Sequence, residues 1–329
     1  MKKTKNKLKV LLIISLVFLT TGCATTLTDK DKQPVKNEVT GQNLIENIIC
    51  KPTDKETIKT YEKNGVKVEK LPDCNEFKIN DGKYESLWTT VFIKPLSFII
   101  IKIGELVKNY ALAVILVSLA IRLIAFPITR KTALQSELIK KAQPELDRLE
   151  KKYANKTDQD SLMKKSQEMT MIYKKYNINP ISGCLYSFIQ LPLFIAFLEA
   201  INRVPSLFEE NFLTLQLGTT PSIGLFTHGN ILYVILIVLV GLTTHYSFSL
   251  NKTTTETQND PMKNMTNVMT GMIVVMGFFM PTALCLYWIT TNLFTIGQNL
   301  IVKRSKEAQW WKKISILEKQ KLKQLKMLK

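Results

Sequence analysis

Acidic residues and histidine are scarce in this sequence. Only 27 Asp and Glu stand against 45 Lys and Arg, which gives a formal net charge of +18, and the chain has only two His. It contains neither a glycine-rich Walker loop nor an HExxH zinc motif. These absences argue against an enzyme, and we expect no catalytic residues, no bound metal and no cofactor.

Long stretches of the chain also lack charge. The excess positive charge lies in the first 23 residues, in residues 130–176 and in the tail after residue 302. Between them lie five apolar runs, near the ~20 residues that a membrane-spanning helix needs: 110–129, 181–200, 231–249, 265–280 and 282–302. The pattern excludes a soluble globular protein, a collagen-like chain and a wholly disordered chain. It predicts an all-α polytopic membrane protein with five transmembrane helices.

Lysine and arginine bias in the loops predicts the orientation of these helices. Residues 130–176 hold 12 basic and 7 acidic groups, and the tail from Lys303 holds 10 basic and 2 acidic groups. Both should therefore lie in the cytoplasm. Five spans then place the N-terminus outside, the C-terminus inside and residues 201–230 outside, in a bacterial cell membrane.

The N-terminus predicts a secretion signal over residues 1–22. Five Lys precede a ten-residue apolar stretch that is too short to span a membrane. The residues that follow, Leu19-Thr20-Thr21-Gly22-Cys23, resemble the lipobox of bacterial lipoproteins. If cleavage occurs before Cys23, a diacylglycerol joined to its sulfur by a thioether bond would anchor the new N-terminus to the outer face. The alternative is ordinary signal cleavage, with no role for Cys23.

Residues 23–94 form the predicted external segment. They are balanced in charge and poor in apolar residues, so we expect a mostly loose tether with little stable core. Cys50 and Cys74 bracket Asn64-Gly65, a strong hairpin-turn signal. An oxidising exterior favours a Cys50–Cys74 disulfide that pins a small hairpin. The alternative is two free thiols on a disordered tether.

Two further helical segments flank the first span. Residues 95–109 carry one stripe of charge on an otherwise apolar helix, which is typical of a helix in the plane of the membrane interface; the stripe consists of Lys102, Glu105 and Lys108. Residues 130–176 contain two amphipathic helical patterns separated by a polar break. They predict an antiparallel helical hairpin in the cytoplasm, with a kink at Pro144.

Polar side chains inside the spans are the candidate functional residues, because an ionisable group in hydrocarbon is costly. Arg122 lies in the first span, and no Asp or Glu lies at a similar depth in another span. Polar or amphipathic side chains of the other spans cluster mainly in the inner half of the bilayer: Ser187, Gln190, Thr244, Trp288, Thr291, Asn292 and Thr295. They predict a hydrophilic groove open to the cytoplasm. The alternative is that these polar groups join helices by hydrogen bonds.

Methionines form a stripe along the fourth span. Met269, Met272 and Met276 are candidates for contact with greasy partners of variable shape, because methionine is flexible and polarisable. The alternative is plain packing or lipid contact.

Four stretches between about Trp88 and Arg304 resemble YidC-type membrane protein insertases: LVSLAIRLIAFPITRK, QPELDRLEKKY, NINPISGCLYSFIQLPLFIAFLEAI and MPTALCLYWITTNLF. The resemblance implies a five-helix core, residues 95–304, with a hydrophilic groove in which Arg122 attracts acidic client residues. It also implies that Gln190 and Trp288 lie at or near the groove. The sequence departs at residues 243–247, where family members commonly carry Gln. The lipobox fits the lipoprotein form of monoderm bacteria.

The function expected is that of an insertase and chaperone. It would move short hydrophilic segments of clients across the bilayer and release their transmembrane helices into lipid, alone or with the Sec translocon. Its partners would be nascent membrane proteins, membrane lipids and, through the hairpin and the tail at residues 305–329, the signal recognition particle pathway and the ribosome. Two alternatives are a secondary transporter, which should show inverted repeats and paired charges, and a surface lipoprotein receptor.

Overall fold

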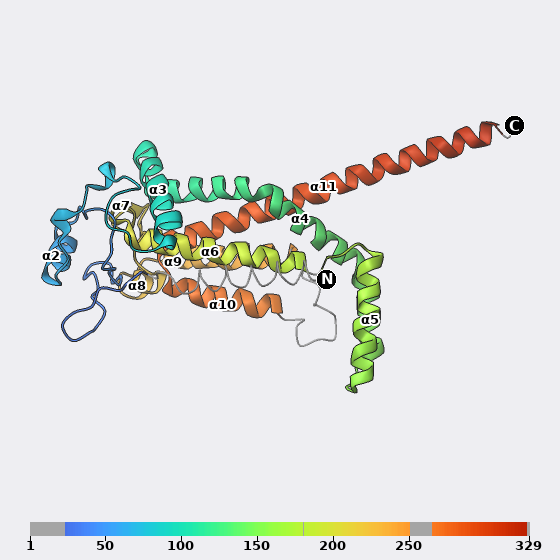
Figure 1. The fold of residues 1–329 in the computed structure, drawn as a ribbon, viewed down its shortest axis with the longest axis horizontal. Coiled ribbons are helices and arrows are strands. Elements are labelled where there is room, and N and C mark those ends of the chain that lie inside the picture. The colour runs from blue at the N-terminus through green and yellow to red at the C-terminus, as the bar shows by residue number, and fades with distance from the viewer. Residues whose placement is uncertain (1–23, 180, 251–264, 328–329) are drawn as a thin grey trace. The chain divides into compact units, whose positions relative to one another are not determined.

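The computed structural model describes residues 24–179, 181–250 and 265–327, with side chains except at 181–189, 265 and 306–327 (Figure 1). The chain divides into two compact units. The first unit comprises Met1–Ile121, Phe188–Leu242 and Gly271–Thr291, and the second comprises Arg122–Ser187, Thr243–Thr270 and Asn292–Lys329. Each is described by itself below.

Each predicted apolar run falls, to within one residue, in one helix: α4 (Tyr110–Tyr153), α6 (Ile181–Arg203), α9 (Leu232–Leu250), α10 (Met265–Phe279) and α11 (Thr282–Met327). Among the described residues, α4 and α9 are long and apolar enough to cross a membrane, and α10 contributes a shorter apolar stretch. Cys23 and the rest of the signal lie outside the described residues.

Two helices continue beyond the predicted ends of their spans. α4 runs from the first span to Tyr153 without a break and contains both Pro127 and Pro144. α11 runs from the fifth span to Met327. The span ends at residues 129 and 302 stay predictions. In both places the sequence changes from apolar to charged, and Pro127 does not end α4. A change of composition does not interrupt the backbone hydrogen bonds of a helix.

The predicted loose tether was also wrong. The first unit contains α2 (Lys55–Lys63), the short 3-10 turns η1 (Val68–Lys70) and η2 (Cys74–Glu76), and a π-helical turn η3 (Thr89–Ile93). The few apolar residues of this segment gather in one core with a phenylalanine that lies far along the chain: Leu27, Leu44, Ile48, Tyr61, Val68 and Phe208. Phe208 supplies apolar area that the segment lacks by itself.

The structure contains the Cys50–Cys74 disulfide, but the expected hairpin is replaced by α2. The Asp54 side chain accepts a hydrogen bond from the Thr57 amide and caps the first turn of this helix. Gly65, at φ +86°, follows its end. The Asn-Gly pair therefore ends a helix here instead of forming a hairpin turn. The N-cap at Asp54 favours a helix before it, and the Asn-Gly signal by itself does not include that information.

Short elements connect the remaining helices of the first unit. α3 (Lys94–Val107) precedes α4 and ends at Lys108, which has φ +53°. Between α6 and α9 lie α7 (Pro205–Phe208), the antiparallel strands β1 (Asn211–Phe212) and β2 (Leu215–Gln216), and α8 (Pro221–Phe226). The sequence pattern had shown only an external loop in this region.

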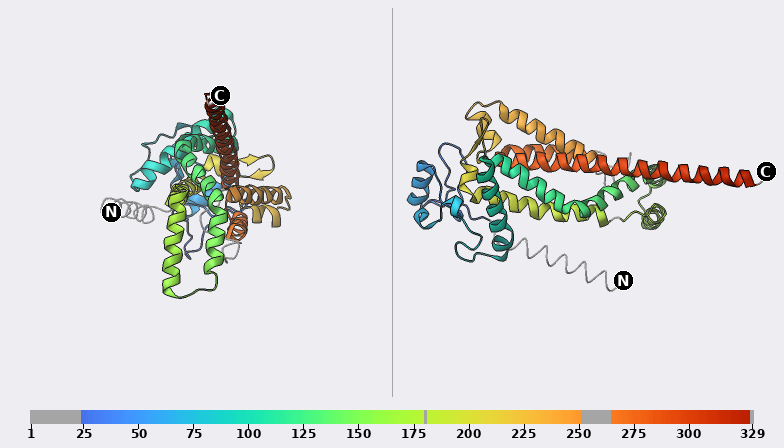
Figure 2. Two further views of the ribbon diagram at one scale, coloured as in Figure 1. Left: turned by 90° about the vertical axis from the view of Figure 1, so that its right-hand side faces the viewer. Right: turned by 90° about the horizontal axis from the view of Figure 1, so that it is seen from above.

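The second unit contains the helical hairpin that the sequence predicts. α5 (Gln159–Lys175) lies antiparallel to the second half of α4, as the two green helices of Figure 2 show. Ile139, Ala142, Leu146 and Ile178 form the buried core between them. Three ion pairs join the two helices of the hairpin: Glu145–Lys175, Glu150–Lys165 and Lys152–Glu168.

Candidate functional site

Polar side chains fill part of the interior of the second unit. They lie on α4, α9 and α11 and are buried although these helices carry the apolar runs: Arg122, Thr129, Thr243, Thr244, Ser247, Asn292, Thr295, Gln298 and Asn299. On α11, Asn292 and Thr295 are three residues apart and Asn299 follows four residues later, which places these three on one helix face. Leu293 and Leu300 of the same helix are exposed. The helix therefore turns its polar face inward and its apolar side outward.

Two hydrogen bonds show which helices face one another in this interior. The Asn292 amide donates to the Thr244 hydroxyl at 2.9 Å, which joins α11 to α9. The Thr129 hydroxyl donates to the Gln298 side-chain oxygen at 2.7 Å, which joins α11 to α4. Phe126 of α4 also meets Phe294 of α11 edge to face, with ring centroids 6.4 Å apart. α11 is thus the shared wall of the polar interior.

Arg122 is 6% exposed and lies seven residues before Thr129. Seven residues are about two helical turns, so both side chains leave the same face of α4. Among the described side chains of the second unit, Arg122 is the only buried one that carries a formal charge. Its guanidinium gives the interior a positive charge.

The structure divides the predicted groove residues between the two units. Arg122, Thr244, Asn292 and Thr295 belong to the second unit, where all four are buried. The Ser187 side chain lies outside the described residues. His245, next to Thr244, is exposed and thus turns away from the polar interior.

Gln190, Trp288 and Thr291 belong to the first unit. The Gln190 amide donates to the Tyr287 hydroxyl at 3.1 Å. The Thr291 hydroxyl donates to the Trp288 carbonyl at 3.1 Å, within α11. Trp288 packs edge-on against Phe194, with ring planes at 86° and centroids 5.1 Å apart. These contacts fix the tryptophan in place and make it part of an apolar wall.

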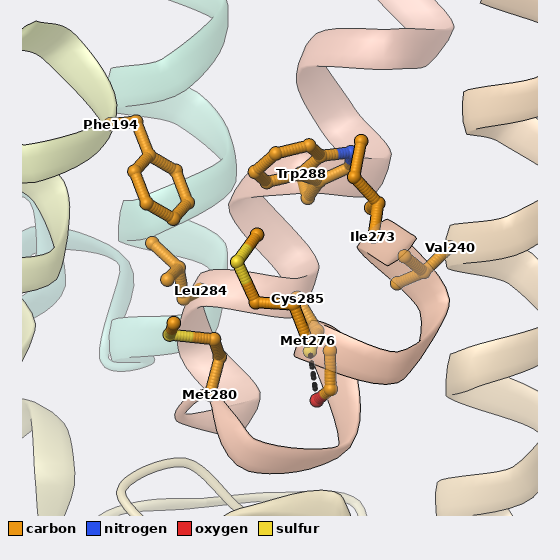
Figure 3. Close-up of a pocket in the computed structure, with 9 residues that line it drawn as sticks. Phe194, Val240, Ile273, Met276, Met280, Leu284, Cys285 and Trp288 are labelled. Carbon is orange, nitrogen blue, oxygen red and sulfur yellow. Dashed lines mark hydrogen bonds between the residues drawn. The ribbon is translucent and has the colours of Figure 1, made fainter. Parts of the chain in front are cut away.

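That wall lines a small apolar pocket of the first unit (Figure 3). Its cavity volume is about 10 Å³, roughly the space of one water molecule. The lining side chains come from α6, α9, α10 and α11: Phe194, Val240, Ile273, Met276, Met280, Leu284, Cys285 and Trp288. The Cys285 thiol donates to the Gly277 carbonyl at 3.6 Å. The interior of the first unit is therefore lined by apolar side chains at this point.

The methionine stripe of α10 does not act as one surface. Met276 lines the apolar pocket, whereas Met272 is 61% exposed and Met269 is half-buried. Positions 269, 272 and 276 are close in angle around a helix. Their exposure differs because neighbouring helices cover Met276 and leave most of Met272 uncovered.

Sequence reasoning missed a buried ion cluster at the end of α6. Arg203 is 1% exposed; one guanidinium nitrogen lies 2.8 Å from Glu85 and the other lies 3.4 Å from Glu199. The Trp88 indole donates to Glu199 at 3.1 Å. Glu199 and Arg203 are four residues apart, a spacing at which opposite charges pair on a helix, so the signal was in the sequence. Glu85 and Trp88 were not predictable as partners because they lie more than 100 residues away.

A second contact that the sequence did not reveal fixes the start of α4. The Tyr110 amide donates to the Glu210 carboxylate at 3.0 Å, which satisfies one of the unpaired N–H groups of the first turn. Burial raises the pKa of Glu210 above its ordinary value, while this hydrogen bond opposes the rise. The loop before β1 is thereby attached to the first turn of α4.

Comparisons with known proteins identify relatives of the chain. Residues 102–309 match the family described as 60Kd inner membrane protein. "Membrane protein insertase YidC" of Oceanobacillus iheyensis is 34% identical over 227 residues, which are 67% of this chain and 85% of that protein. "Membrane protein insertase MisCA" of Bacillus subtilis is 34% identical over 217 residues, 66% of this chain and 79% of that protein.

A solved structure, "Active YidC insertase crystal structure with the first transmembrane domain resolved", is 20% identical to the chain. Its TM-score is 0.45, and the match covers 74% of this chain and 52% of that one.

Proposed function

Because the chain belongs to the 60Kd inner membrane protein family and is a membrane protein insertase of the YidC type, we propose that it passes short hydrophilic client segments through the polar interior of its second unit. The clients' transmembrane helices then move into lipid. The observation that carries this proposal is the set of buried polar side chains around α11, in helices whose other faces are apolar.

The physical gain is a lower cost of taking polar groups out of water. A charged side chain at the centre of a bilayer costs several kcal/mol. The hydrogen bonds from Asn292 to Thr244 and from Thr129 to Gln298 can be exchanged for bonds to a client segment. A client that bonds to both partners of a broken bond leaves no buried group unpaired, so the exchange has a small net cost.

Arg122 gives this interior a preference for negative charge. A fixed guanidinium in surroundings of low dielectric constant attracts a carboxylate more strongly than it does in water. We expect Arg122 to hold acidic residues of the client's external segment while that segment crosses. Gln190, Trp288 and Thr291, with Met269, Met272 and Met276, remain predicted client contacts.

The topology belongs to the same proposal. Five spans, α4, α6, α9, α10 and α11, with the hairpin and the basic tail in the cytoplasm, agree with the distribution of positive charge. Lipid on Cys23 would anchor the external N-terminus. The tail extends α11 to Met327 and carries many Lys, so it is suited to ribosomal RNA, a polyanion. The Sec translocon and the signal recognition particle pathway are further proposed partners.

The test of this function uses Arg122 and a pair of clients. The clients are single-span proteins that differ only in an acidic or a neutral external tail. In cells depleted of their own insertase, the wild-type chain and Arg122→Lys should insert both, because Lys keeps the charge. Arg122→Ala should reduce insertion of the acidic client severalfold and leave the neutral client nearly unchanged. Protease protection of the tail measures insertion.

Equal insertion of both clients by Arg122→Ala would contradict the role of this charge. If Arg122→Ala inserts neither client, and the charge-preserving Arg122→Lys also inserts neither, Arg122 has a structural role instead. Membrane levels of each variant, measured by immunoblot, serve as the control.

A further inference from the structure

The segment from residue 211 to residue 250 contains no Asp, Glu, Lys or Arg. Its second part is α9, a candidate span, but its first part, residues 211–231, lies outside any long helix. A loop of this length in water would ordinarily carry charge, as residues 24–94 of the same unit do. The composition of residues 211–231 is that of a segment in contact with apolar surroundings.

The backbone of this loop is largely paired within the protein. β1 and β2 pair with each other, and the Gln216 amide donates to the Tyr233 hydroxyl at 2.9 Å. Around and after α8, the amides of Gly224, Thr227, Gly229 and Asn230 all donate to carbonyls of the same loop. Internal pairing of this kind is required of backbone that leaves water, because hydrocarbon offers no hydrogen-bond partners.

Three large apolar side chains of the loop are nevertheless exposed. Leu213 is 77% exposed, Phe226 is 80% exposed and Ile231 is 65% exposed. Leu213 lies at the tip of the β-hairpin with φ +57°, a conformation that a leucine rarely adopts. A polar residue or glycine would be the ordinary choice for such a tip in water.

Hydrogen bonds hold the hairpin tip against the start of α9. The Asn230 side chain donates to the Thr214 carbonyl at 2.8 Å and to the Thr214 hydroxyl at 3.0 Å. Thr214 follows Leu213, and Asn230 precedes Ile231. Leu213 and Ile231 are therefore attached to one rigid junction.

The exposed apolar surface continues from this junction along α9. Ile231, Ile235, Val238 and Leu242 are all exposed and follow one another by four, three and four residues. That spacing places them in one stripe on the helix surface. Since α9 is a helix of a cell-membrane protein, the environment that suits this stripe is lipid. Ile231 is its first member, outside the helix.

We propose that residues 211–231 form a lipid-contact foot, with Leu213, Phe226 and Ile231 inserted among the acyl chains just below the headgroups. Insertion of this kind reaches about 5–10 Å into the boundary of the bilayer. The occupant of this surface is lipid rather than a protein partner, because the loop lacks the charged rim of a protein interface and continues the lipid-facing stripe of α9. The assignment to the outer leaflet rests on the proposed topology, whereas the insertion depth does not.

Depth measurement by electron paramagnetic resonance tests this proposal. Spin labels are placed at Leu213→Cys and Phe226→Cys in the full chain, in a background in which Cys184 and Cys285 are replaced by Ala. The protein is reconstituted in vesicles of phosphatidylcholine and phosphatidylglycerol. The background without either new cysteine serves as the blank. Leu162→Cys is the matched control, since Leu162 is also an exposed leucine, 53% accessible, but lies on the charged hairpin. Collisions with oxygen report lipid, and collisions with a water-soluble nickel chelate report water.

The proposal predicts that oxygen collides with the labels at 213 and 226 more often than the nickel chelate does, and that the order is reversed at 162. A label at 213 and 226 that favours the nickel chelate would overturn it, because the loop would then lie in water. Low collision with both reagents would also overturn it, because a second protein surface would then cover the loop. Insertion of the clients is measured separately, so a negative result for lipid contact by residues 211–231 does not contradict the insertase function.

Discussion

The two units differ in where their ion pairs lie. In the first unit an ion pair is buried: Arg203 and Glu199 are almost fully buried, and Glu85 completes the cluster. In the second unit, the ion pairs lie on the exposed hairpin, and the interior holds hydroxyls and amides around Arg122. A buried ion pair tolerates little rearrangement, because each separated charge is left uncompensated. Neutral hydrogen bonds can be exchanged at small cost, so the first unit is suited to a fixed frame and the second to changing partners.

α11 shows a second contrast along a single helix. Around the apolar pocket of the first unit it buries Ala283, Leu284 and Cys285, and in the second unit it buries Asn292, Thr295 and Gln298. Both sets lie on one continuous helix, so side-chain chemistry distinguishes the apolar pocket from the polar interior.

The largest effect should follow from breaking the buried ion cluster. Arg203→Ala leaves Glu199 buried without its charge partner, and such a loss costs about 3–5 kcal/mol. We expect a large fall in the melting temperature of the detergent-solubilised protein. Melting is measured by the fluorescence of a thiol-reactive dye that reacts with Cys285, which is buried in the first unit.

The matched control is the double variant Glu199→Gln with Arg203→Met, which removes both charges. It should recover most of the loss, because no buried charge remains. If the double variant is as unstable as Arg203→Ala, the packing of Arg203 rather than its charge holds the frame.

A smaller effect is expected from opening the Cys50–Cys74 disulfide. The bond closes a loop with a sequence separation of 24 residues, and release of a loop of this length costs about 3 kcal/mol in the chain-entropy model. The double variant Cys50→Ser with Cys74→Ser should loosen the core around Tyr61 and Phe208. Hydrogen exchange in residues 24–76 should rise, while exchange in residues 137–176 stays constant and client insertion survives. A parallel rise in residues 137–176 would mean that the two units do not respond separately.

The smallest effect should come from the ion pairs of the second unit. Hydrogen bonds from Lys175 and Tyr176 hold the pKa of Glu145 below its ordinary value of 4.5. Lys152 and Tyr153 do the same for Glu168. A lowered folded-state pKa contributes stability above the unfolded pKa, and this contribution is lost as the pH falls through the folded value.

Hydrogen exchange in residues 137–176, corrected for intrinsic rates, should therefore be slightly faster at about pH 4 than at neutral pH. Lys175→Met should remove part of that difference, whereas Lys164→Met, on the same helix, should not. The effect is small because solvent screens exposed pairs. A pH effect as large as the Arg203→Ala effect would show that the hairpin depends on charge as the first unit does.

How much was predictable differs between the two units. The apolar runs, the hairpin and the polar face of α11 follow from spacing within one segment, and sequence patterns report such local order well. The core of residues 24–94 depends on Phe208, and the ion cluster depends on Glu85 meeting Arg203. These contacts join residues more than 100 positions apart, which periodicity cannot reveal. The sequence did not indicate that the first span and the first hairpin helix form one continuous helix, because a charged surface continues a helix as readily as an apolar one.

The most direct test of the central claim is photocrosslinking of a stalled nascent client along α11. A photoreactive phenylalanine analogue is placed at three positions: Thr295, buried in the polar interior; Leu293, exposed on the opposite side of the same turn; and Leu284, buried beside the apolar pocket. The polar segment of the client should crosslink chiefly to position 295. Crosslinking that is equal at the three positions, or strongest at 284, would contradict passage through the polar interior of the second unit.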